Sequence, residues 1–170
     1  MNVSAEIAAL VGVIFGAVLS FAATYIAERA SWLRNQAVRW DERRLSAYAD
    51  YSYAVKDVVS LAARLAADRG LETTYEPLEF GPESLAKLAE AATRRTMASE
   101  TFRLLADDDT ATAAGEMTRC VSELESFARG TNQGDSSDWH RAYARYEQAR
   151  DQYIVDARKN LKVTDHRSVS

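Results

Sequence analysis

A chain of 170 residues with a formal net charge of −4 lacks the basic surface that general nucleic-acid binding requires, so nucleic acids are not expected partners. Its single cysteine, Cys120, excludes an intrachain disulfide. Seven glycines and two prolines are few interruptions for this length, which favours helices throughout. These properties predict an all-α protein.

The first element in the chain is the stretch 7–27 (IAALVGVIFGAVLSFAATYIA), which contains no charged residue. About 20 helical residues cross the hydrocarbon core of a bilayer. Residues 1–6 contain no Lys or Arg and so lack the positive region of a signal peptide, although Ser20-Phe21-Ala22 resembles a cleavage site. We expect 7–27 to be a retained transmembrane helix. A cleaved signal peptide and a buried helix of a soluble core are the alternatives.

Basic residues lie on one side of this stretch only. The positive-inside rule therefore places residues 1–6 outside the cell membrane and 28–162 in the cytoplasm, as in a single-pass protein. The flank can determine this topology alone, or it can also bind anionic lipid headgroups. Its arginines and tryptophans are Arg29, Trp32, Arg34, Arg39, Trp40, Arg43 and Arg44.

Small residues recur at every fourth position of the predicted span, on one helical face. Small side chains let two helices approach closely in lipid, so this face predicts packing against a second copy or another membrane protein. The alternative is that Gly and Ala are simply common in membrane helices. The residues are Ala8, Gly12, Gly16, Ser20 and Thr24.

After the span, no Gly or Pro occurs between Gly16 and Gly70, so we predict that the membrane helix continues into the first cytoplasmic helix and ends near Arg69, with Gly70 as its C-cap. A kink of this helix within residues 31–36 is compatible with the sequence. Breakers and caps then divide the rest into an antiparallel four-helix bundle and a polar tail at 163–170. We expect Asp108 or Asp109 to cap the third helix and Ser137 the fourth. The predicted cytoplasmic helices are 28–69, 82–106, 110–129 and 138–161.

Apolar residues at spacings of three and four indicate which face of each helix is buried. The expected first-helix seam is Leu45, Tyr48, Ser52, Val55, Val59 and Ala62. The second helix draws its apolar content from residues that include Met97, Phe102 and Leu104. The expected third-helix seam is Ala114, Met117, Val121, Leu124 and Ala128.

Helical bundles can hold di-iron sites through Glu-x-x-His pairs, but this chain lacks them. Its two histidines, His140 and His166, have Ser137 and Val163 three positions earlier. No P-loop, dinucleotide fingerprint or nucleophile elbow is present, and Asp107-Asp108-Asp109 lacks the spacing of a calcium loop. We therefore expect no enzymatic activity, no cofactor and no metal.

Tyrosines on the first and last helices form the one candidate ligand site. Aromatic side chains from two helices can line a pocket between them, whereas at helical spacing they are more often core residues. Both interpretations stay open for Tyr48, Tyr51, Tyr143 and Tyr146.

Three stretches accompany the small-residue-rich span and its arginine flank. They are Arg43-Arg44-Leu45-Ser46-Ala47-Tyr48, Tyr143-Ala144-Arg145-Tyr146-Glu147 and Asp156-Ala157-Arg158-Lys159-Asn160-Leu161. In layout and composition the chain resembles small single-pass membrane proteins of actinobacteria and their phages, which have a helical cytoplasmic domain and mostly no assigned function. This resemblance implies a membrane-anchored helical domain and supplies no catalytic residues.

The sequence thus favours a membrane-anchored interaction or scaffold module that self-associates or serves as an accessory subunit of a membrane complex. One alternative is a tethered sensor that binds a small molecule or lipid between the bundle helices. The other is a phage-type membrane protein with the helical domain outside.

Overall fold

The computed structural model describes residues 40–162. The predicted transmembrane helix 7–27, its small-residue face, the flank residues up to Arg39 and the tail 163–170 lie outside this range. Within 40–162, no helix combines the length and the apolar character needed to cross a bilayer.

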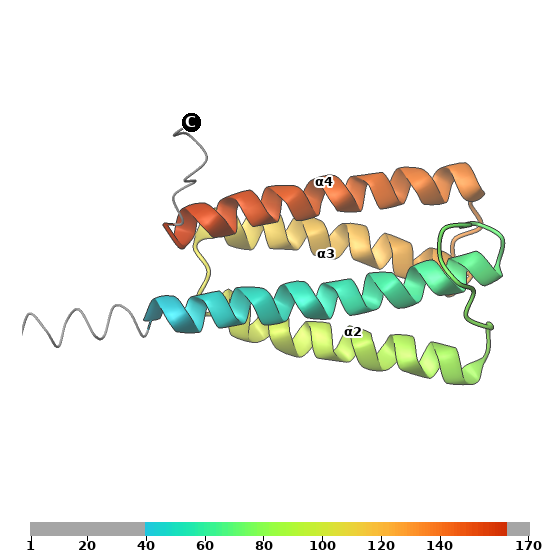
Figure 1. Ribbon diagram of the computed structural model, residues 1–170, viewed down its shortest axis with the longest axis horizontal. Helices are drawn as coiled ribbons and strands as arrows, with labels where there is room; N and C mark the ends of the chain where they lie inside the picture. Colours follow the sequence, from blue (N-terminus) through green and yellow to red (C-terminus); the bar gives the residue numbers. More distant parts are fainter. Residues whose placement is uncertain (1–39, 163–170) are drawn as a thin grey trace, which may run out of the picture. The chain divides into compact units, whose positions relative to one another are not determined.

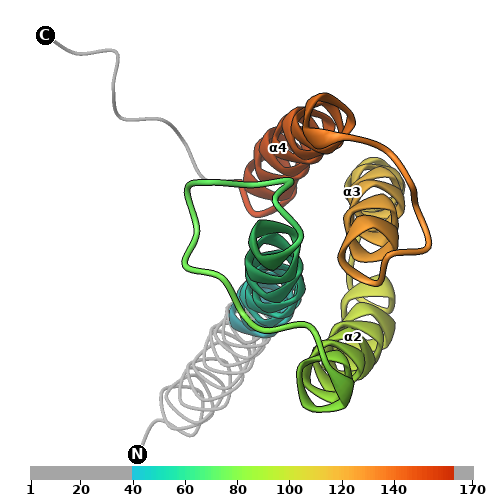
Figure 2. The same cartoon turned by 90° about the vertical axis from the view of Figure 1, so that its right-hand side faces the viewer.

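Residues 40–162 fold into four helices and contain no strand. The helices run alternately up and down, as Figure 1 shows, in the manner of a helical bundle. Viewed end-on in Figure 2, they occupy the corners of a square in which the first helix lies between α4 and α2, and α3 lies diagonally opposite. The elements are the first helix (residues 40–68), α2 (Pro82–Arg103), α3 (Asp108–Ala128) and α4 (Ser136–Asn160).

The first helix contributes a buried stripe that includes Tyr51, Val55, Val58 and Ala62, each at most 1% exposed. This spacing of three and four keeps the side chains on one face. Leu45, which we expected in the same seam, is 57% exposed. At 3.6 residues per turn it lies about 120° away from Tyr51 around the helix, so the expected seam was wrong at this end.

In α3, all five residues of the expected seam are buried, together with Cys120 and Phe127, which confirms the predicted face. In α2, Phe102 is 1% exposed as expected, whereas Met97 and the C-cap residue Leu104 are exposed although we expected them to supply apolar packing. α2 also ends at Arg103, before the expected 106. Its polar middle leaves a stretch between Ala91 and Phe102 without a buried side chain, so α2 is the least embedded of the four helices.

The caps differ from those expected by one or two residues. Asp107, rather than Asp108 or Asp109, caps α3 by accepting a hydrogen bond from the Thr110 backbone N–H at 3.0 Å. Asp135, rather than Ser137, caps α4, because its carboxylate and that of Asp138 each accept the other residue's backbone N–H. The first helix ends as predicted, since Gly70 follows it with a positive φ of 72°.

Candidate functional site

The structure divides the four candidate tyrosines between two groups of rings. Tyr48 and Tyr51 pack against Phe102 of α2, with ring centroids 5.1 and 4.9 Å away, and Tyr51 also meets Tyr153 edge-on at 5.7 Å. The hydroxyl of Tyr48 donates to the side-chain carbonyl of Asn160 at 3.0 Å. These rings form one aromatic layer of the core.

Tyr143 and Tyr146 belong to the second group. Their rings meet at 5.8 Å, and Tyr143 also lies 6.1 Å from the buried Trp139. The hydroxyls of Tyr75 and Tyr143 share a hydrogen bond of 2.8 Å, which ties the loop before α2 to α4. Burial is the main reason that the pKa of each candidate tyrosine is raised, so all four are neutral at physiological pH. That they line one ligand site stays a prediction.

A groove of about 510 Å³ lies between α2 and α3, away from the second aromatic group. The buried rings of Tyr51 and Phe102 form its floor, and small or hydroxyl-bearing side chains form its walls. Two charged residues, Arg103 and Asp108, line the end nearest the α2–α3 connection. The lining residues are Tyr51, Ser99, Phe102, Arg103, Asp108, Ala111, Thr112, Ala114, Gly115 and Thr118.

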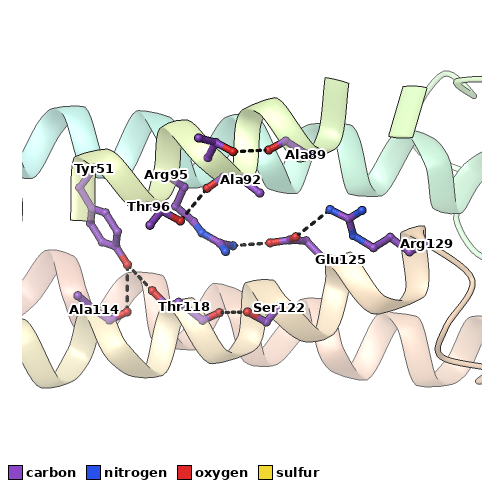
Figure 3. A network of polar contacts seen from close by, with 11 residues as sticks. Tyr51, Ala89, Ala92, Arg95, Thr96, Ala114, Thr118, Ser122, Glu125 and Arg129 are labelled. Carbon is purple, nitrogen blue, oxygen red and sulfur yellow. Dashed lines mark hydrogen bonds and ion pairs between the residues drawn. The ribbon is translucent and has the colours of Figure 1, made fainter. Parts of the chain in front are cut away.

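Figure 3 shows how the Tyr51 hydroxyl joins the first helix to α3. It donates to the Ala114 carbonyl at 3.0 Å and lies 2.7 Å from Thr118 Oγ1. A phenol has one proton, so the Thr118 hydroxyl donates to Tyr51. The Thr118 carbonyl in turn accepts from the Ser122 hydroxyl at 3.0 Å. The floor of the groove is therefore held by a chain of satisfied hydrogen bonds.

An ion pair between Arg95 and Glu125 connects α2 to α3, as Figure 3 also shows. The Arg95 guanidinium lies 2.5 Å from Glu125, and the two side chains are only 11% and 12% exposed. The second Glu125 oxygen lies 3.6 Å from Arg129. Partly buried pairs of this kind cost desolvation energy, so they set which residues face each other more than they add stability. Here the pair connects the two helices where α2 has no buried side chain.

Glu72 forms a second polar centre, in the loop between the first helix and α2. Its carboxylate accepts the backbone N–H groups of Thr73 and Thr74 at 2.7 and 2.8 Å and the indole N–H of Trp139 at 3.0 Å. Burial by itself raises the pKa of Glu72, but these hydrogen bonds outweigh it and hold the pKa at about 2. Glu72 lies between the predicted helices 28–69 and 82–106, and its partner Trp139 lies 67 residues away along the chain.

Three residues of the basic flank fall within the described range. Trp40 is 46% exposed, Arg43 is exposed and Arg44 is half-buried. Cys120 is buried, which raises the pKa of its thiol. Among residues 40–162, no three His, Cys, Asp or Glu side chains are grouped so that they could hold a metal ion.

Comparison of the chain with known protein families, with curated protein sequences and with solved structures gives no match. The resemblance to actinobacterial and phage membrane proteins therefore stays a prediction from the sequence.

Proposed function

We propose that this chain is a membrane-anchored helical interaction module, in which residues 7–27 span the cell membrane and the helical domain faces the cytoplasm. The observation that carries the proposal is the uncharged apolar stretch 7–27 with arginines only on its C-terminal side. We also propose that this span continues into the first helix, because no Gly or Pro lies between Gly16 and Gly70.

The packing of the helical domain supports this proposal. Residues 43–162 belong to one compact unit, and its buried aromatic and aliphatic residues pack into a single core. A domain that buries its apolar residues in its own core can present its polar faces to partners while the span keeps it at the membrane. The partner in the membrane is a second copy or another membrane protein, which packs on the face of Gly12 and Gly16.

Extraction and topology test the anchor. The full-length chain should stay in the membrane fraction after alkaline carbonate washing, and a C-terminal tag should resist protease in intact spheroplasts. Replacing Ile14 by Lys should release a large share of the chain, since a lysine at the centre of a span costs about 3 kcal/mol in insertion. Extraction of the unchanged chain by carbonate would refute the anchor, and digestion of the tag would favour the phage-type topology.

Self-association is tested separately in the membrane. Gly12→Ile with Gly16→Ile should weaken association in a membrane two-hybrid assay, because the larger side chains keep two helices apart. Ala22→Ile, about 100° around the helix from the midpoint of Gly12 and Gly16, is the matched control and should leave the signal unchanged. Equal signals from the unchanged chain and the Gly12/Gly16 variant would contradict self-association through this face.

A further inference from the structure

The groove between α2 and α3 is a hollow that the packing of the bundle does not explain. Protein interiors are close-packed, and facing helices normally fill the space between them with large side chains. Here the facing positions hold Ser99 on α2 and Ala111 and Gly115 on α3, around a volume of about 510 Å³. The Arg95–Glu125 pair connects the two helices on one side of this space.

Gly115 is the most informative residue of the groove. It lies inside α3, where a glycine costs about 0.5–1 kcal/mol relative to alanine. Its φ is not positive, and a Cβ built on it meets no atom within 4 Å. Neither backbone conformation nor close packing within residues 40–162 therefore requires glycine here. The open space beside Gly115 leaves room for a molecule to approach the α3 backbone closely from the groove.

The charged groups of the groove define what such a molecule carries. Arg103 and Asp108 both line it, on either side of the α2–α3 connection. Within residues 40–162, the structure pairs Arg103 with Glu100, 4.0 Å away and highly exposed, which is a weak interaction. One guanidinium is too little for a polyphosphate. A cation and an anion at one end suit a molecule with one carboxylate and one ammonium group.

We propose that this groove binds a zwitterionic, amino-acid-like small molecule. Its carboxylate pairs with Arg103, its ammonium group with Asp108, and its apolar side chain lies along Gly115. The hydroxyls of Ser99 and Thr112 accept or donate along its edge. A volume of about 510 Å³ is within the range of small-molecule sites and admits an aromatic amino acid or a dipeptide. This site is independent of the membrane span and goes beyond the proposed interaction function.

Binding is measured on the full-length chain in detergent micelles by saturation-transfer NMR and calorimetry. The probes are L-leucine, L-phenylalanine and glycyl-L-phenylalanine. The single-charge analogues of phenylalanine are 2-phenylethylamine and 3-phenylpropanoate. We expect at least one zwitterion to bind saturably, and 2-phenylethylamine and 3-phenylpropanoate to bind at least about tenfold more weakly than it, the value of one charge-assisted hydrogen bond. Equal binding of the analogues would overturn the ligand class.

Three variants locate the site. Gly115→Leu fills the groove and should abolish binding while the helical circular dichroism is retained. Arg103→Gln and Asp108→Asn remove exposed charges, do not disturb the core, and should each weaken binding about tenfold. The matched controls Arg94→Gln and Asp109→Asn lie outside the groove and should bind normally. Absence of saturable binding by every zwitterion up to about 10 mM, or binding that all three variants retain, overturns the proposal.

Discussion

Replacing Glu72 by Gln should remove an acid-sensitive part of the domain's stability. The carboxylate accepts three hydrogen bonds, from Thr73, Thr74 and Trp139, and is 7% exposed. Glutamine offers one acceptor oxygen in place of two, so an NH₂ group must face either the loop N–H groups or the Trp139 indole N–H. A buried donor then loses its acceptor at every pH.

The size of the effect follows from the pKa of Glu72, which is lowered from 4.5 to about 2 in the folded protein. The unfolded chain binds this proton at higher pH than the folded chain does. The carboxylate therefore stabilises the fold fully above pH 4.5, and this contribution is lost as the pH falls towards about 2. A shift of this size corresponds to about 3 kcal/mol in the free energy of unfolding.

Urea unfolding of residues 43–170, followed by circular dichroism and by Trp139 fluorescence, measures this contribution. At pH 7 Glu72→Gln should lower the free energy of unfolding by about 3 kcal/mol, and near pH 2 the difference from the unchanged protein should largely disappear. Glu79→Gln, an exposed position on the same loop, is the matched control and should have little effect. A Glu72→Gln deficit that is equally large at both pH values would refute the assignment to an ionised, hydrogen-bonded carboxylate.

Three further substitutions test the helix contacts by the same urea unfolding. Glu125→Leu should lower the free energy of unfolding by about 3 kcal/mol, because it leaves Arg95 without this partner. Adding Arg95→Met should restore most of this loss, and a double variant as unstable as the single one would contradict the reasoning. Gly115→Ala should raise the free energy of unfolding by about 0.5–1 kcal/mol, whereas a loss would mean that neighbouring atoms pack closely against Gly115. Gly134→Ala should lower the free energy of unfolding by about 1–3 kcal/mol, because the new Cβ would lie 2.8 Å from the Phe127 ring. An unchanged free energy of unfolding would show that the ring can move away.

Local signals account for what could be predicted before the structure. The order of the helices and the breaks between them depend on residues that act within one or two turns. Gly70 ends the first helix through its positive φ, and Pro82 begins α2 at its first turn. The buried face of α3 was also predictable, because its apolar residues keep a regular spacing of three and four. The caps were misplaced by one or two residues because several adjacent Asp and Ser side chains can cap equally well.

The sequence by itself determined the uncharged stretch 7–27, the charge asymmetry around it and the all-helical character of residues 40–162, because these depend on composition and on neighbours along the chain. Only the tertiary structure decided which tyrosines meet, that Glu72 reaches Trp139, and that Arg95 faces Glu125 beside a groove. These contacts depend on how each helix is rotated about its axis, and on partners 30 or more residues away. A small rotation of α2 would change all of its contacts with α3 and leave its sequence pattern the same.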